Sequence, residues 1–344
     1  MEHSQEIVLP YQIRSYVLES VIGYGGFGTV YKAKSLNYGN EYEFAVKSIK
    51  MPDKMNSKHY KHYQSFESEV QSLKRLDHPN IIRLYDYFQE GSYMFLVLEY
   101  CEGGTLETNI PTLTYYEKIK ACLDIVNGIT YIHENMIAHR DIKTLNILFD
   151  SNGRAKIADF GLSQKFFQDN DKISKTEGSL LYISPEIIKG VPFSAFKSDI
   201  WALGVLIYRV FTGIYPFSGF DKDEIVKNIL CGIYNLSLVP PPLVGVVKSS
   251  LLPHPEDRMK IETIQQTLTK LCKDSKTFFS ARLGKLQRSS IIISSNIKLA
   301  SGKSGPLSLT NLNKQRQLTK KFLSPSKLAL HNFYTSRSKL NLHE

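Results

Sequence analysis

Between residues 15 and 104 the chain alternates short apolar and polar runs in a pattern typical of strands around one helix. Three runs rich in β-branched and aromatic residues predict strands: 16–22, 29–35 and 41–49. Residues 65–76 carry apolar side chains every three or four positions, so they predict a helix that His78-Pro79 ends. Residues 94–100 predict a buried strand, and the glycines of 102–104 mark a hinge between two lobes.

Helical periodicity dominates from about residue 105 to residue 272. Long amphipathic runs predict helices at 116–134, 223–230 and 261–271. The strongly apolar run 200–211 contains one arginine and is too short to span a membrane, so it predicts a buried helix. Residues 146–150 and 154–159 predict a small hairpin that turns at Asn152-Gly153. The pattern therefore predicts a strand-rich region followed by a mainly helical one.

The net charge of +10 is concentrated at the C-terminal end. Residues 273–344 hold 14 Lys and Arg but only two acidic residues, whereas the rest of the chain carries a balance of about −2. This tail is also rich in Ser and Thr and has no long periodic run, a composition that predicts disorder. The basicity therefore characterises the tail and carries no information about the globular part.

The remaining composition is ordinary for a soluble globular protein, with 42% hydrophobic and 22% charged residues. No secretory signal is visible in the first 15 residues, and no apolar run is long enough for a membrane span. The four cysteines follow no disulfide or metal-binding spacing: Cys101, Cys122, Cys231 and Cys272. We therefore expect a reducing compartment, the cytoplasm or the nucleus.

Two short motifs supply groups for phosphoryl transfer. Residues 139–146 read HRDIKTLN, and residues 159–161 read DFG. Asp141 can orient a hydroxyl group, while Asn146 and Asp159 can bind magnesium. Because phosphoryl transfer needs positioning and charge neutralisation more than covalent help, these three residues form a candidate catalytic set.

A glycine-rich segment, GYGGFGTV at 23–30, adds a candidate nucleotide site. Gly23, Gly25 and Gly28 let backbone amides approach phosphates without a Cβ in the way. The segment continues as a strand and does not open a helix, which favours a flap over a nucleotide and disfavours a Rossmann fingerprint. A plain glycine hairpin is the alternative for this motif taken alone.

Lys47 ends the strand-like sequence FAVK and can hold nucleotide phosphates. Such a lysine needs an anionic partner, and Glu69 in the following helix is the candidate. A single lysine on a strand is more often a solvated side chain. The order of glycine loop, lysine and helix glutamate favours the phosphate-binding interpretation.

In this order, the motifs resemble those of a eukaryotic Ser/Thr protein kinase, broadly similar to the calcium/calmodulin- and AMP-regulated branch. The resemblance extends to SPE at 184–186 and SDIWALG at 198–204. It implies a two-lobed α+β kinase fold, with a small antiparallel β-sheet lobe containing one key helix and a larger, mainly helical lobe. The implied domains are an N-terminal extension at 1–15, a kinase domain at 16–272 (lobes 16–100 and 101–272) and a basic, Ser-rich disordered tail at 273–344.

The resemblance also implies the activity of a non-specific protein serine/threonine kinase. Such an enzyme transfers the γ-phosphoryl group of ATP to Ser/Thr hydroxyls of protein substrates in signal transduction, with Mg²⁺. Catalytic roles are implied for Lys47, Glu69, Asp141 and Lys143, and magnesium binding for Asn146 and Asp159. The other implied nucleotide contacts are Ile22, Gly23, Gly25, Gly28, Val30, Ala45, the gatekeeper Leu98, Glu99, Cys101 and Leu148.

Several structural contacts are implied in the same way. The resemblance makes His139 a packing residue rather than a base. It implies a stack of four side chains, Leu73, Leu84, His139 and Phe160. Glu186 is implied to pair with Arg258, and Asp199 to anchor the catalytic loop.

The neighbours of the catalytic aspartate bear on the substrate. Lys143, two residues after that aspartate, resembles Ser/Thr rather than tyrosine kinases. Ser179 stands where the family usually has threonine, and it keeps a hydroxyl that can bond the catalytic side chains. Basophilic relatives often carry acids where Leu145 and Thr105 stand here, with Glu107 two residues later. We therefore predict no strong requirement for arginine two or three residues before the target.

The segment between DFG and SPE contains two phosphosite candidates, Thr176 and Ser174, of which Thr176 is favoured. In the family, an arginine at the position of Arg140 contributes to a basic pocket that a phosphate on this segment can organise. This interpretation implies an upstream activating kinase as a partner. The alternative is a segment that is active without modification.

The basic tail and the catalytic motifs leave further alternatives open. Residues 276–295 interleave bases with apolar side chains, so a tail-binding regulator is a candidate partner, although a solvated tail is favoured. The tail could also tether the kinase to a membrane or to a partner protein. Nucleic acid is disfavoured as a partner, because the sequence shows no folded nucleic-acid-binding domain. A catalytically dead pseudokinase scaffold is the remaining alternative, but Lys47, Asp141 and Asp159 all stand.

Overall fold

A computed structural model describes residues 7–24, 28–37, 42–51, 57–168, 171–174 and 178–277. Apart from Thr277, these residues belong to one compact unit, residues 1–276. The tail was predicted to be disordered, and its residues from 278 onward lie outside the described ranges. Gly25 and Thr176 also lie outside them.

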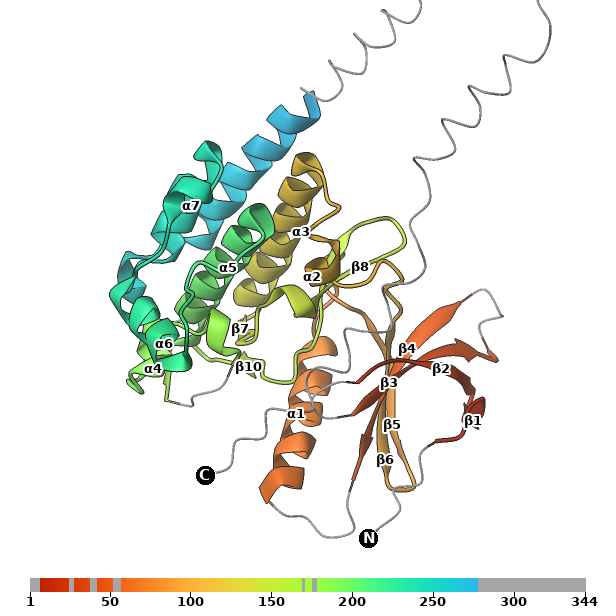
Figure 1. Cartoon of the computed structure of the whole chain (residues 1–344). Helices are drawn as coiled ribbons and strands as arrows, with labels where there is room; N and C mark the ends of the chain where they lie inside the picture. Colours follow the sequence, from red (N-terminus) through yellow and green to blue (C-terminus); the bar gives the residue numbers. More distant parts are fainter. Residues whose placement is uncertain are drawn as a thin grey trace, which may run out of the picture. The chain divides into compact units, whose positions relative to one another are not determined.

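The N-terminal region forms an antiparallel six-stranded sheet with strand order β1-β2-β3-β4-β6-β5 (Figure 1). Its strands are β1 Tyr11–Ile13, β2 Tyr16–Tyr24, β3 Thr29–Ser35, β4 Glu43–Lys50, β5 Leu84–Glu90 and β6 Tyr93–Glu99. Burial alternates along β3 and along the first three residues of β2, which reflects the apolar alternation of the sequence. Residues 11–13, inside the predicted N-terminal extension, pair with β2 and therefore belong to the sheet.

The helix of this lobe, α1, spans Ser57–Leu73, whereas the sequence predicted 65–76. The early start was missed because residues 57–64 are polar apart from two tyrosines and show no apolar period. The end was placed too late because the chain leaves the helix in a tightened turn, with Arg75 N–H on Ser72 O and Leu76 N–H on Leu73 O. The apolar side of α1 is buried in the main core.

The larger lobe is mainly helical, as predicted, and α3, α5 and α7 lie side by side in it (Figure 1). Its α-helices are α2 Leu106–Asn109, α3 Tyr115–Glu134, α4 Pro185–Ile188, α5 Ala195–Thr212, α6 Lys222–Cys231, α7 Pro241–Ser250 and a last helix at 261–277. Its 3₁₀ turns are η1 Thr144–Asn146, η2 Leu180–Tyr182, η3 Leu236–Leu238 and η4 Pro255–Asp257. The last helix runs past the implied domain end at 272.

Three two-stranded ribbons complete this lobe. They are β7 Ile137–Ala138 with β10 Gln164–Lys165, β8 Ile147–Phe149 with β9 Ala155–Ile157, and β11 Lys172–Ile173 with β12 Phe193–Ser194. The β8–β9 hairpin turns where predicted, at Gly153, which has a φ of +67°. The short ribbons fix the ends of the loops that carry the HRD and DFG motifs.

Helix α5 is the buried centre of the larger lobe and confirms the buried helix predicted at 200–211. Most of its side chains are inaccessible, and Gly204 lets it approach α7 closely, since a Cβ there would lie 2.7 Å from the Ser250 Cβ. A capping box formed by Thr114 and Glu117 begins the neighbouring helix α3. Within the described ranges, no helix is long and apolar enough to cross a membrane.

Candidate active site

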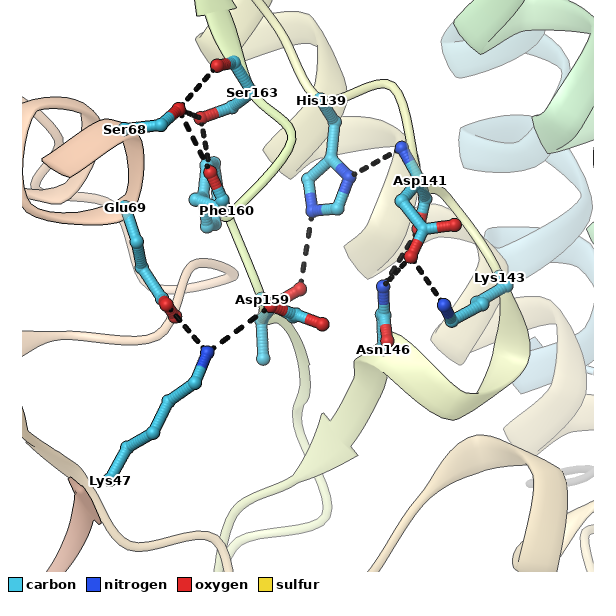
Figure 2. Close-up of polar contacts among 11 residues, drawn as sticks. Lys47, Ser68, Glu69, His139, Asp141, Lys143, Asn146, Asp159, Phe160 and Ser163 are labelled. Carbon is cyan, nitrogen blue, oxygen red and sulfur yellow. Dashed lines mark hydrogen bonds and ion pairs between the residues drawn. The ribbon is translucent and has the colours of Figure 1, made fainter. Parts of the chain in front are cut away.

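Lys47 is held by two carboxylates that come from distant parts of the chain (Figure 2). Its Nζ lies 2.6 Å from Glu69 Oε2 on α1 and 3.4 Å from Asp159 Oδ1 after β9. Burial alone would lower the pKa of Lys47, but the charges of Glu69 and Asp159 outweigh it and raise the pKa, so the ammonium group stays charged. The predicted Lys47–Glu69 pair is therefore present.

Asp159 faces the same site from a strained backbone. Its φ of +63° lies in the left-handed region, which a non-glycine residue keeps only when its surroundings hold it there. Lys47 lowers the pKa of its carboxyl group against the opposing effect of burial, which keeps the carboxylate ionised. The side chain is 41% exposed and can reach a ligand.

The carboxylate of Asp141 receives hydrogen bonds from three side chains. Lys143 Nζ and Asn146 Nδ2 both contact Oδ2, the latter at 3.1 Å, and Ser179 Oγ donates to Oδ1 at 3.1 Å. Lys143 Nζ also donates to Ser179 Oγ at 3.2 Å, so the expected bonds of the Ser179 hydroxyl are present. These contacts fix the direction of the Asp141 carboxylate.

Asp199 on α5 holds the backbone of the catalytic loop through hydrogen bonds. Its carboxylate accepts the N–H groups of His139 at 2.8 Å and Arg140 at 2.9 Å, as expected for a loop anchor. His139 is fully buried; its Nδ1 accepts from Asp141 N–H at 3.3 Å, and its Nε2 lies 3.2 Å from Ala158 O. His139 thus links two backbone segments through its two ring nitrogens and packs, edge to face, on Phe160.

The residues expected around the nucleotide come from five strands, β2, β3, β4, β6 and β8, and from the hinge. Ala45 pairs with Leu98, and Val30 pairs with Lys47, so these positions share one part of the sheet. Ile22 and Gly23 lie on β2, Leu148 lies on β8, and Glu99 and Cys101 lie at the hinge; Leu98 is buried. At Gly28, a Cβ would lie 1.9 Å from Ser48 O, so close strand packing requires a glycine there independently of any phosphate.

The chemistry of the donor groups fits Mg²⁺ and ATP. Asn146 turns its amide N–H groups toward Asp141, with Nδ2 2.8 Å from Asp141 O, which leaves the amide oxygen for a cation. That oxygen and the Asp159 carboxylate are ligands of the hard type that Mg²⁺ prefers. The part of the chain that the structure describes contains no complete metal cluster of His, Cys, Asp and Glu.

Three arrangements near the site were not predicted from the sequence. Lys156 Nζ binds the hinge side chain Glu99 at 2.8 Å, and Arg209 Nη2 binds Glu107 Oε1 at 2.6 Å. Hydroxyl groups of α1 contact the segment that follows Asp159, with Ser68 Oγ 2.5 Å from Ser163 O. The partners in each case lie far apart in the sequence, and no local motif marks them.

The activation segment is described only in part. Ser174 is exposed directly after β11, whereas the position of Thr176 is not described. Arg140 Nη1 donates to Leu162 O at 3.2 Å and Gln164 Oε1 at 3.3 Å, so its guanidinium lies at the foot of this segment. This position suits the predicted contribution to a phosphate pocket.

The expected pair of Glu186 and Arg258 is bidentate, with Nη1–Oε1 and Nη2–Oε2 distances of 2.7 and 2.6 Å. Both side chains are buried, and the guanidinium lies 5.0 Å from the centre of the Trp201 ring. Further donation to the carbonyls of Lys197 and Leu252 leaves the group well satisfied. The pair joins α4 to the end of the larger lobe.

Comparison with known proteins agrees with this geometry. The family model "Protein kinase domain" matches residues 16–281. NUAK family SNF1-like kinase 1 of Mus musculus is 35% identical over 256 residues, 72% of this chain and 37% of the relative. Calcium-dependent protein kinase 4 of Plasmodium berghei is 35% identical over 225 residues, 63% of this chain and 41% of the relative.

The names of these relatives agree with the predicted resemblance to the calcium/calmodulin- and AMP-regulated branch. The match spans about two fifths of the length of these curated relatives. The family model, in contrast, covers well over half of the chain and includes every catalytic motif discussed above. This chain therefore belongs to the protein kinase family.

Proposed function

We propose that this chain is a protein serine/threonine kinase that transfers the γ-phosphoryl group of Mg-ATP to hydroxyl groups of proteins. The observation that carries the proposal is the joint geometry of two groups: Lys47 paired with Glu69, and Asp141 held by Lys143 and Asn146. A scaffold without activity has no need for either group, and membership of the kinase family supports the same conclusion.

The chain's own residues would act by positioning and by electrostatics. Asp141 orients the substrate hydroxyl and takes its proton, and Lys143, 3.2 Å from Ser179, brings positive charge to the same place. The bond from the substrate oxygen to the γ-phosphorus forms while the bond to the oxygen that bridges the β- and γ-phosphates breaks. When bound, Mg²⁺ neutralises phosphate charge. Lys47 holds the remaining phosphates through a charge fixed by Glu69.

Phosphoamino-acid analysis tests the proposed specificity. The full chain is incubated with ATP labelled at the γ-phosphate and a mixed protein substrate, and the label is expected on Ser and Thr. The matched variant Asp141→Asn keeps the shape of the side chain and is expected to lose the transfer. Label found mainly on Tyr, or transfer unaffected in Asp141→Asn, would contradict the proposal.

The surroundings of Glu107 support a substrate preference that does not depend on basic residues. Both oxygens of its carboxylate are engaged: Oε1 by Arg209 at 2.6 Å, and Oε2 by the hydroxyl of Thr144. This acid is therefore neutralised within the protein and is a poor partner for a substrate arginine. Next to Thr144, the side chain of Leu145 is apolar and 45% exposed.

On a peptide array we expect no dominant arginine signal two or three residues before the phosphorylated position. Leu145→Glu is expected to raise the ratio of kcat/KM for arginine-containing over arginine-free peptides about three- to fivefold, as for one partly exposed ion pair. Leu145→Gln, of the same size but neutral, is the control and should leave the ratio unchanged. A dominant arginine signal in the unmodified chain would show that another acid recognises the peptide.

We also propose that an upstream kinase activates the chain at Thr176. Arg140 at the foot of the segment supports this, because a phosphate can gain charge-assisted hydrogen bonds from a guanidinium. After treatment with an activating kinase, Thr176→Ala is expected to be about tenfold less active than the chain without substitution treated in the same way. Ser174→Ala should be activated as strongly as the chain without substitution. Full activity of Thr176→Ala would favour a segment that is active without phosphate.

A further inference from the structure

Four serines form a hydroxyl cluster between α1 and the segment that follows Asp159. We define this serine cluster as Ser65, Ser68, Ser72 and Ser163. The first three are spaced by three and four residues and therefore lie on one face of α1. All but Ser68 are buried, and Ser68 is half-buried. Figure 2 shows Ser68 and Ser163 facing each other beside Phe160.

The hydrogen bonds of the cluster have one consistent direction. Ser163 Oγ donates to Phe160 O at 2.6 Å, and the N–H group of Ser163 donates to the same oxygen at 3.0 Å. Because the single proton of the Ser163 hydroxyl is used in this way, Ser72 Oγ, 2.8 Å away, must donate to Ser163 Oγ. Ser68 Oγ donates to Ser163 O at 2.5 Å. Two hydroxyls of α1 thus bind the carbonyl and the hydroxyl oxygen of Ser163.

Opposite Ser65, the helix and the segment approach so closely that no side chain fits at position 161. A Cβ placed on Gly161 would lie 2.3 Å from Ser65 Oγ. Helix α1 and the segment are therefore packed directly against each other at this point. Arg140 Nη1 donates to the carbonyl oxygen of Leu162 in the same segment, at 3.2 Å.

The two bodies joined by the cluster each carry one partner of Lys47. Helix α1 carries Glu69, next to Ser68 in the sequence, and the segment carries Asp159, next to Phe160. The contacts therefore close a ring: from Lys47 through Glu69 and α1 to the serines, and back through Phe160 to Asp159. Asp159 keeps its left-handed φ of +63° where this ring fixes the following carbonyl group.

We propose that Ser68, Ser72 and Ser163 are positioning residues that couple the place of α1 to the conformation of Asp159. Through them, the backbone that orients the Asp159 carboxylate toward a bound cation is stable only while α1 stands close enough to pair Glu69 with Lys47. The inference rests on the proposed kinase function for its kinetic consequences. Its binding consequences, in contrast, concern only the affinity for nucleotide in the presence of Mg²⁺.

The test compares full-length Ser163→Ala with the unmodified chain in a titration of Mg²⁺ at saturating ATP. We expect kcat to fall about fivefold and the Mg²⁺ concentration for half-maximal rate to rise about fivefold, as for one net buried hydrogen bond. The KM for the peptide should stay unchanged, because the cluster contacts α1 and the segment after Asp159 and not the proposed peptide site. An unchanged Mg²⁺ requirement in a folded Ser163→Ala protein would overturn the proposal.

Matched variants separate positioning from general stability. Ser68→Ala should show the same change in Mg²⁺ requirement as Ser163→Ala, and Ser68→Thr, which keeps the hydroxyl, should restore it. Ser250→Ala is the control, because Ser250 is a buried serine at the end of α7, facing Gly204 of α5, whose hydroxyl makes no hydrogen bond in the described structure. If Ser163→Ala fails to fold, the Ser68 pair decides: loss in Ser68→Ala without recovery in Ser68→Thr would contradict the coupling.

Binding of nucleotide keeps this proposal separate from the proposed function. By calorimetry, Ser163→Ala should bind ATP like the unmodified chain in EDTA and about fivefold more weakly with Mg²⁺. If the chain without substitution transfers no phosphate, but Ser163→Ala still binds ATP more weakly than that chain when Mg²⁺ is present, the proposed activity is wrong and the coupling stands. If transfer is normal and the difference is absent, the coupling is wrong and the activity stands.

Discussion

Replacing Asp159 with asparagine is expected to lower phosphoryl transfer about a thousandfold or more while the protein stays folded. The carboxylate lies 3.4 Å from Lys47 Nζ and is the charged oxygen group closest to that ammonium after Glu69. An amide of the same shape keeps one oxygen but removes the negative charge, so the affinity for Mg²⁺ in the reacting complex is lost. Initial rates with ATP labelled at the γ-phosphate measure the effect.

A second aspartate supplies the control for this substitution. Asp150 accepts the N–H groups of Asn152 and Arg154, each at 2.9 Å, in the turn between β8 and β9, away from Lys47. Asp150→Asn tests whether loss of one carboxylate near the hinge lowers the rate by itself, and we expect less than a twofold change. A rate of Asp159→Asn within tenfold of the unmodified chain would exclude Asp159 as an essential magnesium ligand. Absence of transfer in both proteins would favour the pseudokinase alternative.

The catalytic side chains could be predicted because each lies in a short motif with fixed spacing. Asp141, Lys143 and Asn146 fall within one turn-rich loop, where local geometry alone brings their side chains together. The pair of Lys47 and Glu69 needed more, since 22 residues separate them, but a lysine on a strand followed by a helix that carries a glutamate is itself an ordered pattern. Spacing was therefore enough for the chemistry.

The contacts that tune the site could not be predicted in this way. Arg209 and Glu107 lie 102 residues apart, and Ser68 and Ser163 lie 95 apart. Serines do not contribute to hydrophobic periodicity, so the serines of α1 look like an ordinary polar helix face in the sequence. Only the fold shows that this face contacts the segment after Asp159. The arginine in the apolar run 200–211 could be recognised as an exception, but only the fold supplies its partner, Glu107.

Strands and helices could be predicted where buried side chains recur at a regular spacing. They were harder to predict where a segment becomes a strand only by pairing with a neighbouring strand. β3, β4 and β6 were predicted because alternation or continuous apolarity marks them. β1 has only one buried residue, Ile13, and forms because β2 offers a free edge to residues 11–13. The start of α1 likewise follows from the continuation of a buried helix into polar sequence, which no local signal marks.

The ion pair between Glu186 and Arg258 is expected to have the largest effect on stability. Arg258→Met should lower the free energy of unfolding by about 3–5 kcal/mol, because it leaves the Glu186 carboxylate, only 5% exposed, without its bidentate partner. The carbonyls of Lys197 and Leu252 lose a donor as well. Urea unfolding followed by tryptophan fluorescence measures the loss, since the single tryptophan, Trp201, lies beside the guanidinium.

A double substitution decides whether the loss comes from the uncompensated charge. Arg258→Met combined with Glu186→Gln removes that charge, so the double variant should be more stable than Arg258→Met alone, although less stable than the unmodified chain. Lys197→Met is the control: its pair with Glu256 spans 3.7 Å at the surface, and its loss should cost less than about 0.5 kcal/mol. If Arg258→Met and the double variant unfold at the same urea concentration, the lost hydrogen bonds and packing of the guanidinium account for its contribution, and the buried charge of Glu186 does not.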